Sequence, residues 1–511
     1  MHKLPLLFLL LLLAGSGFGQ KASFNITSYG AKPDGETNNG EAIQKAIDEA
    51  ATRGGRVVVP AGQFVTGPLH LKSGVELHLN RGAFLLGSTK RLDYSAEKGM
   101  AMLIADSQQN LAITGQGVID GQGRQLIQNL LELLRAGTLE DPEWKIKRPT
   151  ERNRTHLINF DNCNGVRITG VTLKDASSWV QAYRQCRNMV FDSIRVESTA
   201  YWNNDGIDFV DCRNVRLTNS FFNTADDGIC LKSEDASRSC DSIYVADCTV
   251  RSSASAFKLG TGSLGGFRRI TVRNLTVYDT FRSAIALEAV DGAVLEDIDI
   301  RNVMGRNTGN AIFIRLGQRK VGAPAGTVRR VYIANVKVEV PAGKPDKGYE
   351  IEGPVYKEPH NVNPSSVTGL PGHPVQDVTL ENIDITYAGG ANKTVAYASL
   401  DSLSVVPERA PNYPEFSMFG ELPAYGFYVR HAEGLTLKNV RIRTTGPDYR
   451  PALVFDDVQK LTLQDVTIPT APTTPVVVLQ EVTSLSMKKL TTPVSKQKAV
   501  QVLSSKNRKQ L

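Results

Sequence analysis

The sequence is poor in the residues and motifs that mark several large classes of protein. It contains seven histidines and six cysteines in 511 residues, and no C-x-x-C pair with zinc-site spacing. No P-loop and no Ser-His-Asp order is visible. Beyond the first twenty residues, no apolar run approaches the length that spans a bilayer. We therefore expect no metal, no cofactor, no nucleic acid and no membrane among its partners.

The composition is that of a soluble globular protein. Hydrophobic residues make up 41% and charged residues 22%, which argues against a disordered chain or a membrane protein. The formal charge of +7 suits an acidic polymer as partner, and it is equally the charge of an ordinary solvated surface. We expect a monomer.

Both ends of the chain are expected to lie outside the folded domain. His2 and Lys3 precede an apolar run over 4–14, and small residues follow it, which predicts a secretory signal peptide over 1–19. Residues 506–511 form a basic tail that we expect to be frayed. The mature protein would then be exported, to the periplasm or the extracellular space, with a single domain over 20–505.

One sequence unit recurs along most of the chain. It joins an alternating apolar run, a small polar residue and a second alternating run, as in V-R-I-T-G-V-T-L from Val166 and L-T-L-K-N-V-R-I from Leu435. Early copies start roughly 23 to 28 residues apart, within the range of solenoid repeats. The central polar position is occupied by Gly170, Ser193, Asn219, Asp247, Asn274, Asp297, Asn335, Asn382, Asn439 and Asp465.

These central residues predict how the chain turns between strands. Glycine, asparagine, aspartate and serine tolerate a left-handed backbone, so one such residue can turn the chain without a hairpin. The alternating apolar residues would point inward and stack on equivalent residues of the next coil. We infer an all-β fold, a right-handed parallel β-helix.

A helix is expected to close the amino-terminal end of this solenoid. Ile43, Ala46, Ile47 and Ala50 share one face of a helix over 39–52, and Gly54 and Gly55 stop it. Its apolar face can cover the open end, which would otherwise expose strand edges.

Four cysteines occupy the same position in successive repeats: Cys163, Cys186, Cys212 and Cys240. We expect an internal stack of small apolar side chains, in which disulfide pairing between neighbours is possible but not required.

Three stretches interrupt the repeat. They are the segment 122–155, with a leucine-rich helical pattern and a basic run, the Gly- and Pro-rich segment 340–376, and the segment 388–425. Insertions in a solenoid tend to collect on one face, so we expect some of them to wall a groove.

Three carboxylates stand out within the repeats. Asp205 precedes the pair Asp226 and Asp227 by about twenty residues, roughly one solenoid period. Residues one period apart stack at about 4.8 Å, so one aspartate would lie beside two on the next coil. Glycosidic hydrolysis needs such a group, with one acid to protonate the leaving oxygen and a carboxylate to activate water. Each Asp-Gly step is also an ordinary turn signal.

The N-N-D-G-I-D segment from Asn203, A-D-D-G-I-C-L-K-S from Ala225 and S-Y-G-A-K-P-D-G from Ser28 together resemble glycoside hydrolase family 28, the polygalacturonase family. The resemblance covers most of the mature chain. It implies a pectin-lyase-like right-handed parallel β-helix and metal-free hydrolysis with inversion. It also implies that Asp226 is the general acid and that Asp205 and Asp227 hold and activate the water.

The sequence departs from the family pattern at two places. Ala254-Ser255-Ala256 stands where the family has Gly-His-Gly, and Ala286-Leu287-Glu288 stands where it has the Arg-Ile-Lys that grips the galacturonate carboxylate. Lys258 and Arg282 are candidates to replace the lost positive charges. The alternative is a different sugar at the cleavage subsite, as in rhamnogalacturonan or another branched pectin.

Six further residues are candidates for substrate contact. Lys232 alternates with Gly228 and Cys230 and should share a face with the aspartates, although a solvated strand lysine has the same pattern. Trp179 and Trp202 flank the catalytic coils, where tryptophan can stack on a sugar or serve in the core. The full set is Lys232, Lys258, Arg282, Glu288, Trp202 and Trp179. Asp208, an odd step from Asp205, is interpreted as a structural turn or hydrogen-bonding residue.

The sequence therefore predicts a secreted glycoside hydrolase acting on an acidic pectic polysaccharide of galacturonan or rhamnogalacturonan type. Two alternatives remain open. A β-helix pectin lyase would cleave by elimination, usually with calcium, and a non-catalytic carbohydrate-binding β-helix would bind polymer without releasing product.

Overall fold

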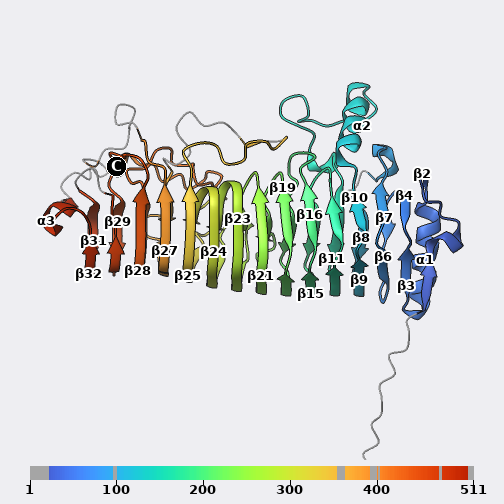
Figure 1. The fold of residues 1–511 in the computed structure, drawn as a ribbon, viewed down its shortest axis with the longest axis horizontal. Coiled ribbons are helices and arrows are strands. Elements are labelled where there is room, and N and C mark those ends of the chain that lie inside the picture. The colour runs from blue at the N-terminus through green and yellow to red at the C-terminus, as the bar shows by residue number, and fades with distance from the viewer. Residues whose placement is uncertain are drawn as a thin grey trace, which may run out of the picture.

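The protein is a long solenoid of parallel strands (Figure 1). The computed structural model describes residues 22–95, 100–320, 322–350, 352–353, 363–391, 400, 403–470 and 475–503. Every strand pairing between named strands is parallel, and the partners follow each other at one-coil intervals. The predicted parallel β-helix is confirmed. The predicted signal peptide over 1–19 and the basic tail over 506–511 lie outside the described residues.

Three ladders of strands run along the solenoid. The first, which we call the site ladder, comprises β5 (Leu69–His70), β8 (Ala101–Asp106), β11 (His156–Asp161), β14 (Gln181–Arg184), β17 (Ile207–Val210), β20 (Ile229–Ser233), β22 (Phe257–Ser263), β26 (Ser365–Thr368), β29 (Leu453–Gln459), β31 (Val477–Thr483) and β33 (Val500–Leu503). The ends of β23 and β24 and the start of β28 also belong to it.

The second ladder contains β1 (Ser23–Asn25), β3 (Arg56–Val59), β6 (Glu76–Leu79), β9 (Gln109–Gly115), β12 (Asn164–Thr169), β15 (Arg187–Asp192) and β18 (Arg213–Thr218). The third contains β2 (Asp34–Asn38), β4 (Gly62–Thr66), β7 (Ala83–Gly87), β10 (Val118–Asp120), β13 (Thr172–Lys174), β16 (Arg195–Ser198) and β19 (Phe221–Thr224). Farther along, single long strands serve both ladders: β21 (Cys240–Ser252), β23 (Gly266–Ala289), β24 (Val294–Leu316), β25 (Thr327–Val340), β27 (Val375–Tyr387), β28 (Phe427–Thr444), β30 (Thr462–Thr467) and β32 (Ser486–Thr491).

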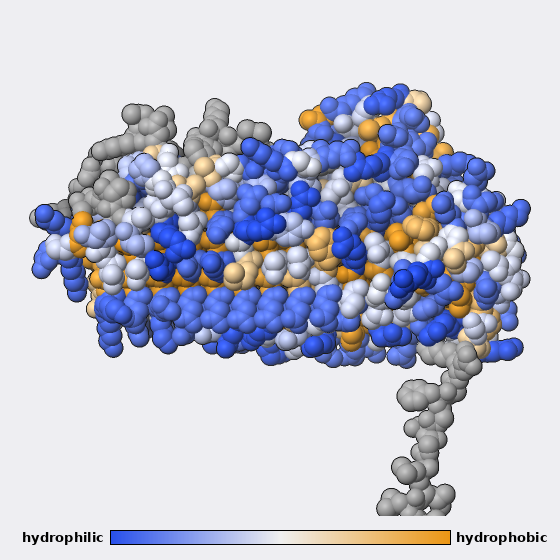
Figure 2. Space-filling model, in the orientation of Figure 1, coloured by the Kyte–Doolittle hydropathy of each residue, from blue (hydrophilic) through white to orange (hydrophobic). Residues whose placement is uncertain are grey.

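The turn between the second and third ladders is built as the repeat predicts. Every residue assigned to the central polar position has a left-handed backbone, with φ between 51° and 76°. Asparagine side chains at this turn hydrogen-bond from coil to coil, as from Asn335 Nδ2 to Asn302 Oδ1 at 2.9 Å. This row of hydrogen-bonded side chains runs through Asp247, Asn274, Asn302, Asn335, Asn382 and Asn439. Figure 2 shows regular rows of polar residues along the lower part of the solenoid.

One of the assigned turn positions was wrong by a few residues. Asn302, and not Asp297, stacks between Asn274 and Asn335. Asp297 also has a positive φ of 59°, but it lies in the adjoining turn, where it accepts a hydrogen bond from Arg330 Nε at 2.7 Å. Both turns need a left-handed residue, so the local sequence does not distinguish them.

A single hydrophobic core fills the solenoid from Phe24 to Ala499. All six cysteines are buried and free, and Cys186 Sγ accepts a hydrogen bond from the Cys163 backbone at 3.3 Å. The predicted stack of small apolar side chains is therefore confirmed. At the amino-terminal end, helix α1 (Gly40–Arg53) turns fully buried Ile43 and Ile47 into this core and covers it (Figure 1).

The described parts of the insertions lie along one edge of the solenoid, at the top in Figure 1, where the chain passes from the third ladder to the site ladder. Helix α2 (Gly123–Arg135) matches the predicted helical segment. The described ranges also contain the short helices η1 (Ile26–Tyr29), η2 (Arg91–Asp93), η3 (Glu151–Asn153), η6 (Leu403–Val405) and α3 (Lys496–Ala499). No helix of the described ranges is long and apolar enough to cross a membrane.

Candidate active site

Asp205 and the pair Asp226 and Asp227 lie on neighbouring coils of the site ladder. Asp205 stands just before β17 and the pair just before β20, and Ile207 pairs with Ile229, so Asp205 is in register with Asp227. Gly206 N donates to Asp227 O at 2.9 Å. A Cβ at Gly206 would lie 2.5 Å from Gly228 O, so this close backbone approach requires glycine. The predicted stack of one aspartate beside two is confirmed.

Asp227 is a buried carboxylate held by positive partners. Its Oδ2 accepts from Lys258 Nζ at 3.0 Å, and its Oδ1 accepts from the backbone of Ser255 at 3.0 Å. Burial acts to raise the pKa of Asp227, but Lys258 and Arg282 outweigh burial and hold the pKa below its ordinary value. Asp227 is therefore ionised. Ser255 stands where the family pattern has histidine, and it is the backbone N–H of Ser255 that donates to Asp227.

The pKa of Asp226, the adjoining residue, is shifted in the opposite direction. Burial, followed by the charge of Asp227, raises the pKa of Asp226 above its ordinary value. Asn203, whose φ of 58° is left-handed, donates from Nδ2 to Asp226 Oδ2 at 3.3 Å. The pKa values of two adjoining carboxyls are thus shifted in opposite directions, which is the kind of separation that acid–base hydrolysis needs.

Asp205 shares its cation with a fourth aspartate. Lys232 Nζ donates to Asp205 Oδ2 at 3.3 Å and makes a short ion pair with Asp208. One oxygen of Asp205, one of Asp227 and the sulfur of Cys230 all lie within 4.8 Å of one another. Burial, and then the charges of Asp226 and Asp208, raise the pKa of Asp205 well above its ordinary value.

Asp208 is closer to this group than the sequence suggested. It lies inside β17 rather than in a turn, it is fully buried, and it pairs across the ladder with Cys230. Burial raises the pKa of Asp208 to about 6, against the opposing effect of Lys232. Its hydrogen-bonding role was predicted, but its direct link to Lys232 was not.

Glu288 faces the same cluster from the next coils. Its Oε2 lies 3.9 Å from Lys258 Nζ and accepts from Thr261 Oγ1 at 3.1 Å. Burial raises the pKa of Glu288 to about 7, and Lys258 opposes this rise. Glu288 is therefore a partner of Lys258.

The segment from Leu403 to Tyr425 supplies two site residues that the sequence did not reveal. Tyr413 Oη accepts from Lys258 Nζ at 3.3 Å, and Glu415 Oε2 lies 3.6 Å from Arg282 Nη2. Arg282 thus reaches the cluster as expected, but a carboxylate of the protein already faces it. Tyr413 is 155 residues from Lys258, so no local pattern could connect them.

The same segment closes the outer face of the site ladder beyond the aspartates. Phe416 and Phe419 belong to a second hydrophobic cluster that includes the outward-facing residues Phe313, Tyr428 and Val454. Phe416 packs edge-on against Phe281, with ring centroids 6.3 Å apart. Part of the predicted insertion 388–425 therefore does form a wall, on the carboxyl-terminal side of the site. Residues 392–399 and 401–402 of that insertion lie outside the described residues.

The two candidate tryptophans differ in accessibility. Trp179 is 8% exposed, with Lys232 Nζ 4.3 Å from its ring centroid and the Arg184 guanidinium at 5.0 Å. It supports these two cations and offers little surface to a sugar. Trp202 is 37% exposed, and the Arg148 guanidinium lies 5.7 Å from its ring centroid.

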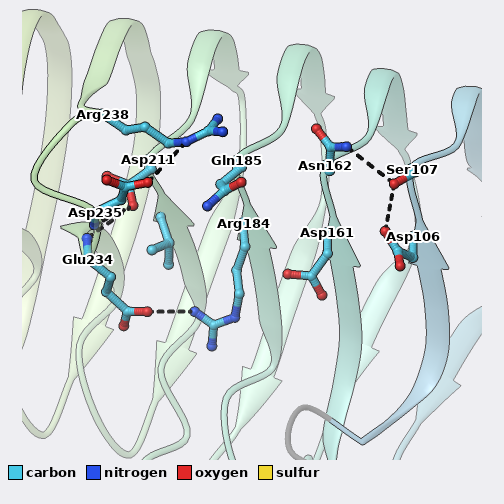
Figure 3. Close-up of a pocket in the computed structure, with 11 residues that line it drawn as sticks. Asp106, Ser107, Asp161, Asn162, Arg184, Gln185, Asp211, Glu234, Asp235 and Arg238 are labelled. Atoms are coloured by element: carbon cyan, nitrogen blue, oxygen red, sulfur yellow. Dashed lines mark hydrogen bonds and ion pairs between the residues drawn. The ribbon is translucent and has the colours of Figure 1, made fainter.

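A separate cavity of about 410 Å³ lies at the other ends of the strands, across the ladder from the aspartates. Figure 3 shows the ion pair between Arg184 and Glu234 at this cavity, with Nη1 to Oε2 at 3.5 Å. Five carboxylates and two arginines contribute to its lining, so it disfavours an acidic sugar. The lining residues are Asp106, Ser107, Asp161, Asn162, Arg184, Gln185, Val210, Asp211, Glu234, Asp235 and Arg238.

Comparison with known proteins identifies the family and the fold. The model of glycosyl hydrolases family 28 matches residues 51–404. The exo-poly-alpha-D-galacturonosidase of Dickeya chrysanthemi is 26% identical over 453 residues, covering 75% of each chain. The solved family 28 exopolygalacturonase of Yersinia enterocolitica is similar with a TM-score of 0.60, at 20% identity, over 92% of this chain and 79% of that one. The hyperthermoactive exopolygalacturonase of Thermotoga maritima gives a TM-score of 0.54, at 24% identity, over 72% and 87%.

Proposed function

The chain belongs to glycosyl hydrolases family 28 and is a glycoside hydrolase, and we propose that it cleaves glycosidic bonds in pectic polysaccharide with inversion. Asp226, Asp205 and Asp227 carry the reaction. The acidic polymer is of galacturonan or rhamnogalacturonan type. A galacturonosidase is among the relatives, which supports this substrate class. The protein is exported after loss of residues 1–19, and it works as a monomer without metal or cofactor.

The reaction divides between the three aspartates, with the opposite pKa shifts of Asp226 and Asp227 separating acid from base. Asp226, protonated, donates its proton to the glycosidic oxygen as the bond to the anomeric carbon breaks. Asp227, ionised, takes a proton from a water molecule that attacks the anomeric carbon from the opposite face. Asp205 orients that water beside Asp227, since their oxygens lie within 4.8 Å of each other.

One observation carries this assignment. Adjacent residues on one coil have pKa values displaced in opposite directions, Asp226 upward and Asp227 downward. Lys258 contacts Asp227 directly at 3.0 Å and lowers its pKa, so of these two neighbours Asp226 is the one that takes up a proton more easily. Lys232, Lys258, Arg282 and Glu288 hold these carboxyls in their protonation states.

The test is product analysis with wild type and Asp226→Asn on polygalacturonate, its oligomers, rhamnogalacturonan and branched pectin. We expect saturated products of inverted anomeric configuration from at least one substrate, and none from the variant. Asp465→Asn is the matched control, because Asp465 is an aspartate in a left-handed turn away from the site, where asparagine is tolerated. Unchanged activity in Asp226→Asn overturns the assignment.

Two other outcomes point to the alternatives. Unsaturated products that absorb in the ultraviolet, lost with a chelator, indicate a pectin lyase. Binding of a polymer without any product indicates a carbohydrate-binding role.

A further inference from the structure

We propose that Arg148 and Trp202 form a subsite that binds the carboxylate of an acidic sugar beside the catalytic acid. This inference rests on the proposed function and deepens it, because it names the residue that recognises a uronate. Arg148 belongs to the insertion between β10 and β11 and is absent from the family pattern discussed above.

The cations closest to the aspartates are already committed. Lys232 faces Asp205 and Asp208, Lys258 faces Asp227 and Glu288, and Arg282 faces Glu415. Each of the three cations therefore already has at least one carboxyl of the protein as its partner. A substrate carboxylate placed among them would compete with these protein carboxyls for the same cations, so we look for its partner outside this cluster.

Arg148 differs from these three cations. It is half-buried, and among the described residues no carboxylate lies within ion-pair distance of its guanidinium. Arg154 is close enough for Arg148 to help lower its pKa, after the larger effect of burial. Glu151 and Asp205 act on Arg154 in the opposite direction, so Arg154 has carboxylates nearby and Arg148 is the guanidinium left for a ligand. Guanidinium binds carboxylate through two parallel hydrogen bonds.

Hydrogen bonds of Trp202 and its neighbour Asn203 connect the region of Arg148 with Asp226. Arg154 donates from Nη1 to Trp202 O at 2.6 Å and from Nη2 to Asn203 Oδ1 at 2.8 Å. Asn203 in turn donates to Asp226 Oδ2 at 3.3 Å. The backbone of Trp202 is therefore held one residue from Asn203, a direct contact of the catalytic acid, and its ring is 37% exposed. An aromatic ring packs against the apolar face of a sugar, and the sugar's carboxylate then reaches Arg148.

The test measures binding separately from turnover. Calorimetry with the Asp226→Asn protein compares unesterified galacturonate oligomers with their methyl esters. We expect the unesterified oligomer to bind more tightly, and Arg148→Gln to weaken its binding by ~10-fold or more while the ester is little affected. Trp202→Ala should weaken both ligands alike, because stacking does not depend on the carboxylate charge.

The same insertion offers a matched control. Lys145 also lies over a tryptophan, with Nζ 5.5 Å from the ring centroid of Trp144. Lys145→Gln removes the same charge and should leave both affinities unchanged. Equal losses for acid and ester in Arg148→Gln, no loss at all, or an equal loss in Lys145→Gln overturns the proposal. If wild type releases no product from any pectic polymer, the proposed function fails, whereas the binding comparison still decides the subsite.

Discussion

Lys258 Nζ lies 3.0 Å from Asp227 Oδ2, and both residues are almost completely buried, at 2% and 3% exposure. Two buried charges are stable together only when each satisfies the other, so removal of one leaves a costly unpaired charge. This pair is the reason that a carboxylate remains ionised within a cluster of other carboxyls.

Lys258→Gln should move the acidic limb of the pH profile of kcat/KM upward. Asp227 must be ionised to act as base, and Lys258 is the main force lowering its pKa against burial. Without that charge the pKa rises, so activity is lost at a higher pH as the pH falls. A displacement of about one unit or more corresponds to about 1.4 kcal/mol per unit. Lys438→Gln, which removes an exposed partner of Glu381, is the control. An unmoved acidic limb contradicts the role given to Asp227.

Glu288→Gln should make the stability of the protein less dependent on pH. Burial raises the pKa of Glu288 from 4.5 to about 7. Between these values the folded protein holds a proton that the unfolded chain has released, so this group lowers stability as the pH rises, by roughly 3 kcal/mol at most. Urea unfolding at pH 5 and pH 8 should show a smaller difference in the variant. Glu339→Gln, at an exposed position of β25, should retain the wild-type difference, and a variant like wild type would refute the prediction.

Asn335→Ala should destabilise the solenoid more than Asn335→Gly. Both substitutions remove the hydrogen bonds to Asn302 and Asn382, at 2.9 and 2.8 Å. Alanine must also adopt a φ of 56°, which glycine does freely. We expect a loss of about 2 kcal/mol for alanine and about 1 kcal/mol for glycine. Denaturant unfolding measures the free energy of unfolding of both variants. Equal losses would show that the left-handed backbone does not contribute to the difference.

The wall formed by Leu403–Tyr425 should make the enzyme act from chain ends. The second hydrophobic cluster occupies the outer face of the ladder beyond the site, where a continuing polymer would lie. Wild type should release reducing ends well ahead of any loss of viscosity. Phe416→Ala removes about 3 kcal/mol of packing from the wall and should make viscosity fall faster per bond cleaved. Val405→Ala, at an exposed position of the same segment, is the control, and rapid viscosity loss with wild type rules out the effect.

The repeat was readable because each coil imposes the same local demands. Alternating apolar residues mark the inward face, and Asn382 or Asp465 marks a left-handed turn, whatever the rest of the chain does. The same regularity placed Asp205 beside Asp227, since one period along the sequence is one step along the axis. It failed at Asp297 and Asn302, where two adjoining turns in one coil both require a left-handed residue.

The sequence by itself determined the parallel β-helix, its capping helix and the meeting of the aspartates, because these depend on periodic, local properties of the chain. Only the tertiary structure decided which charges face one another. Tyr413 and Glu415 reach Lys258 and Arg282 from a distant insertion. Asp208 forms an ion pair with Lys232 of the next coil. Such contacts depend on how side chains from separate segments share a buried volume, and this sharing decides which aspartate keeps its proton.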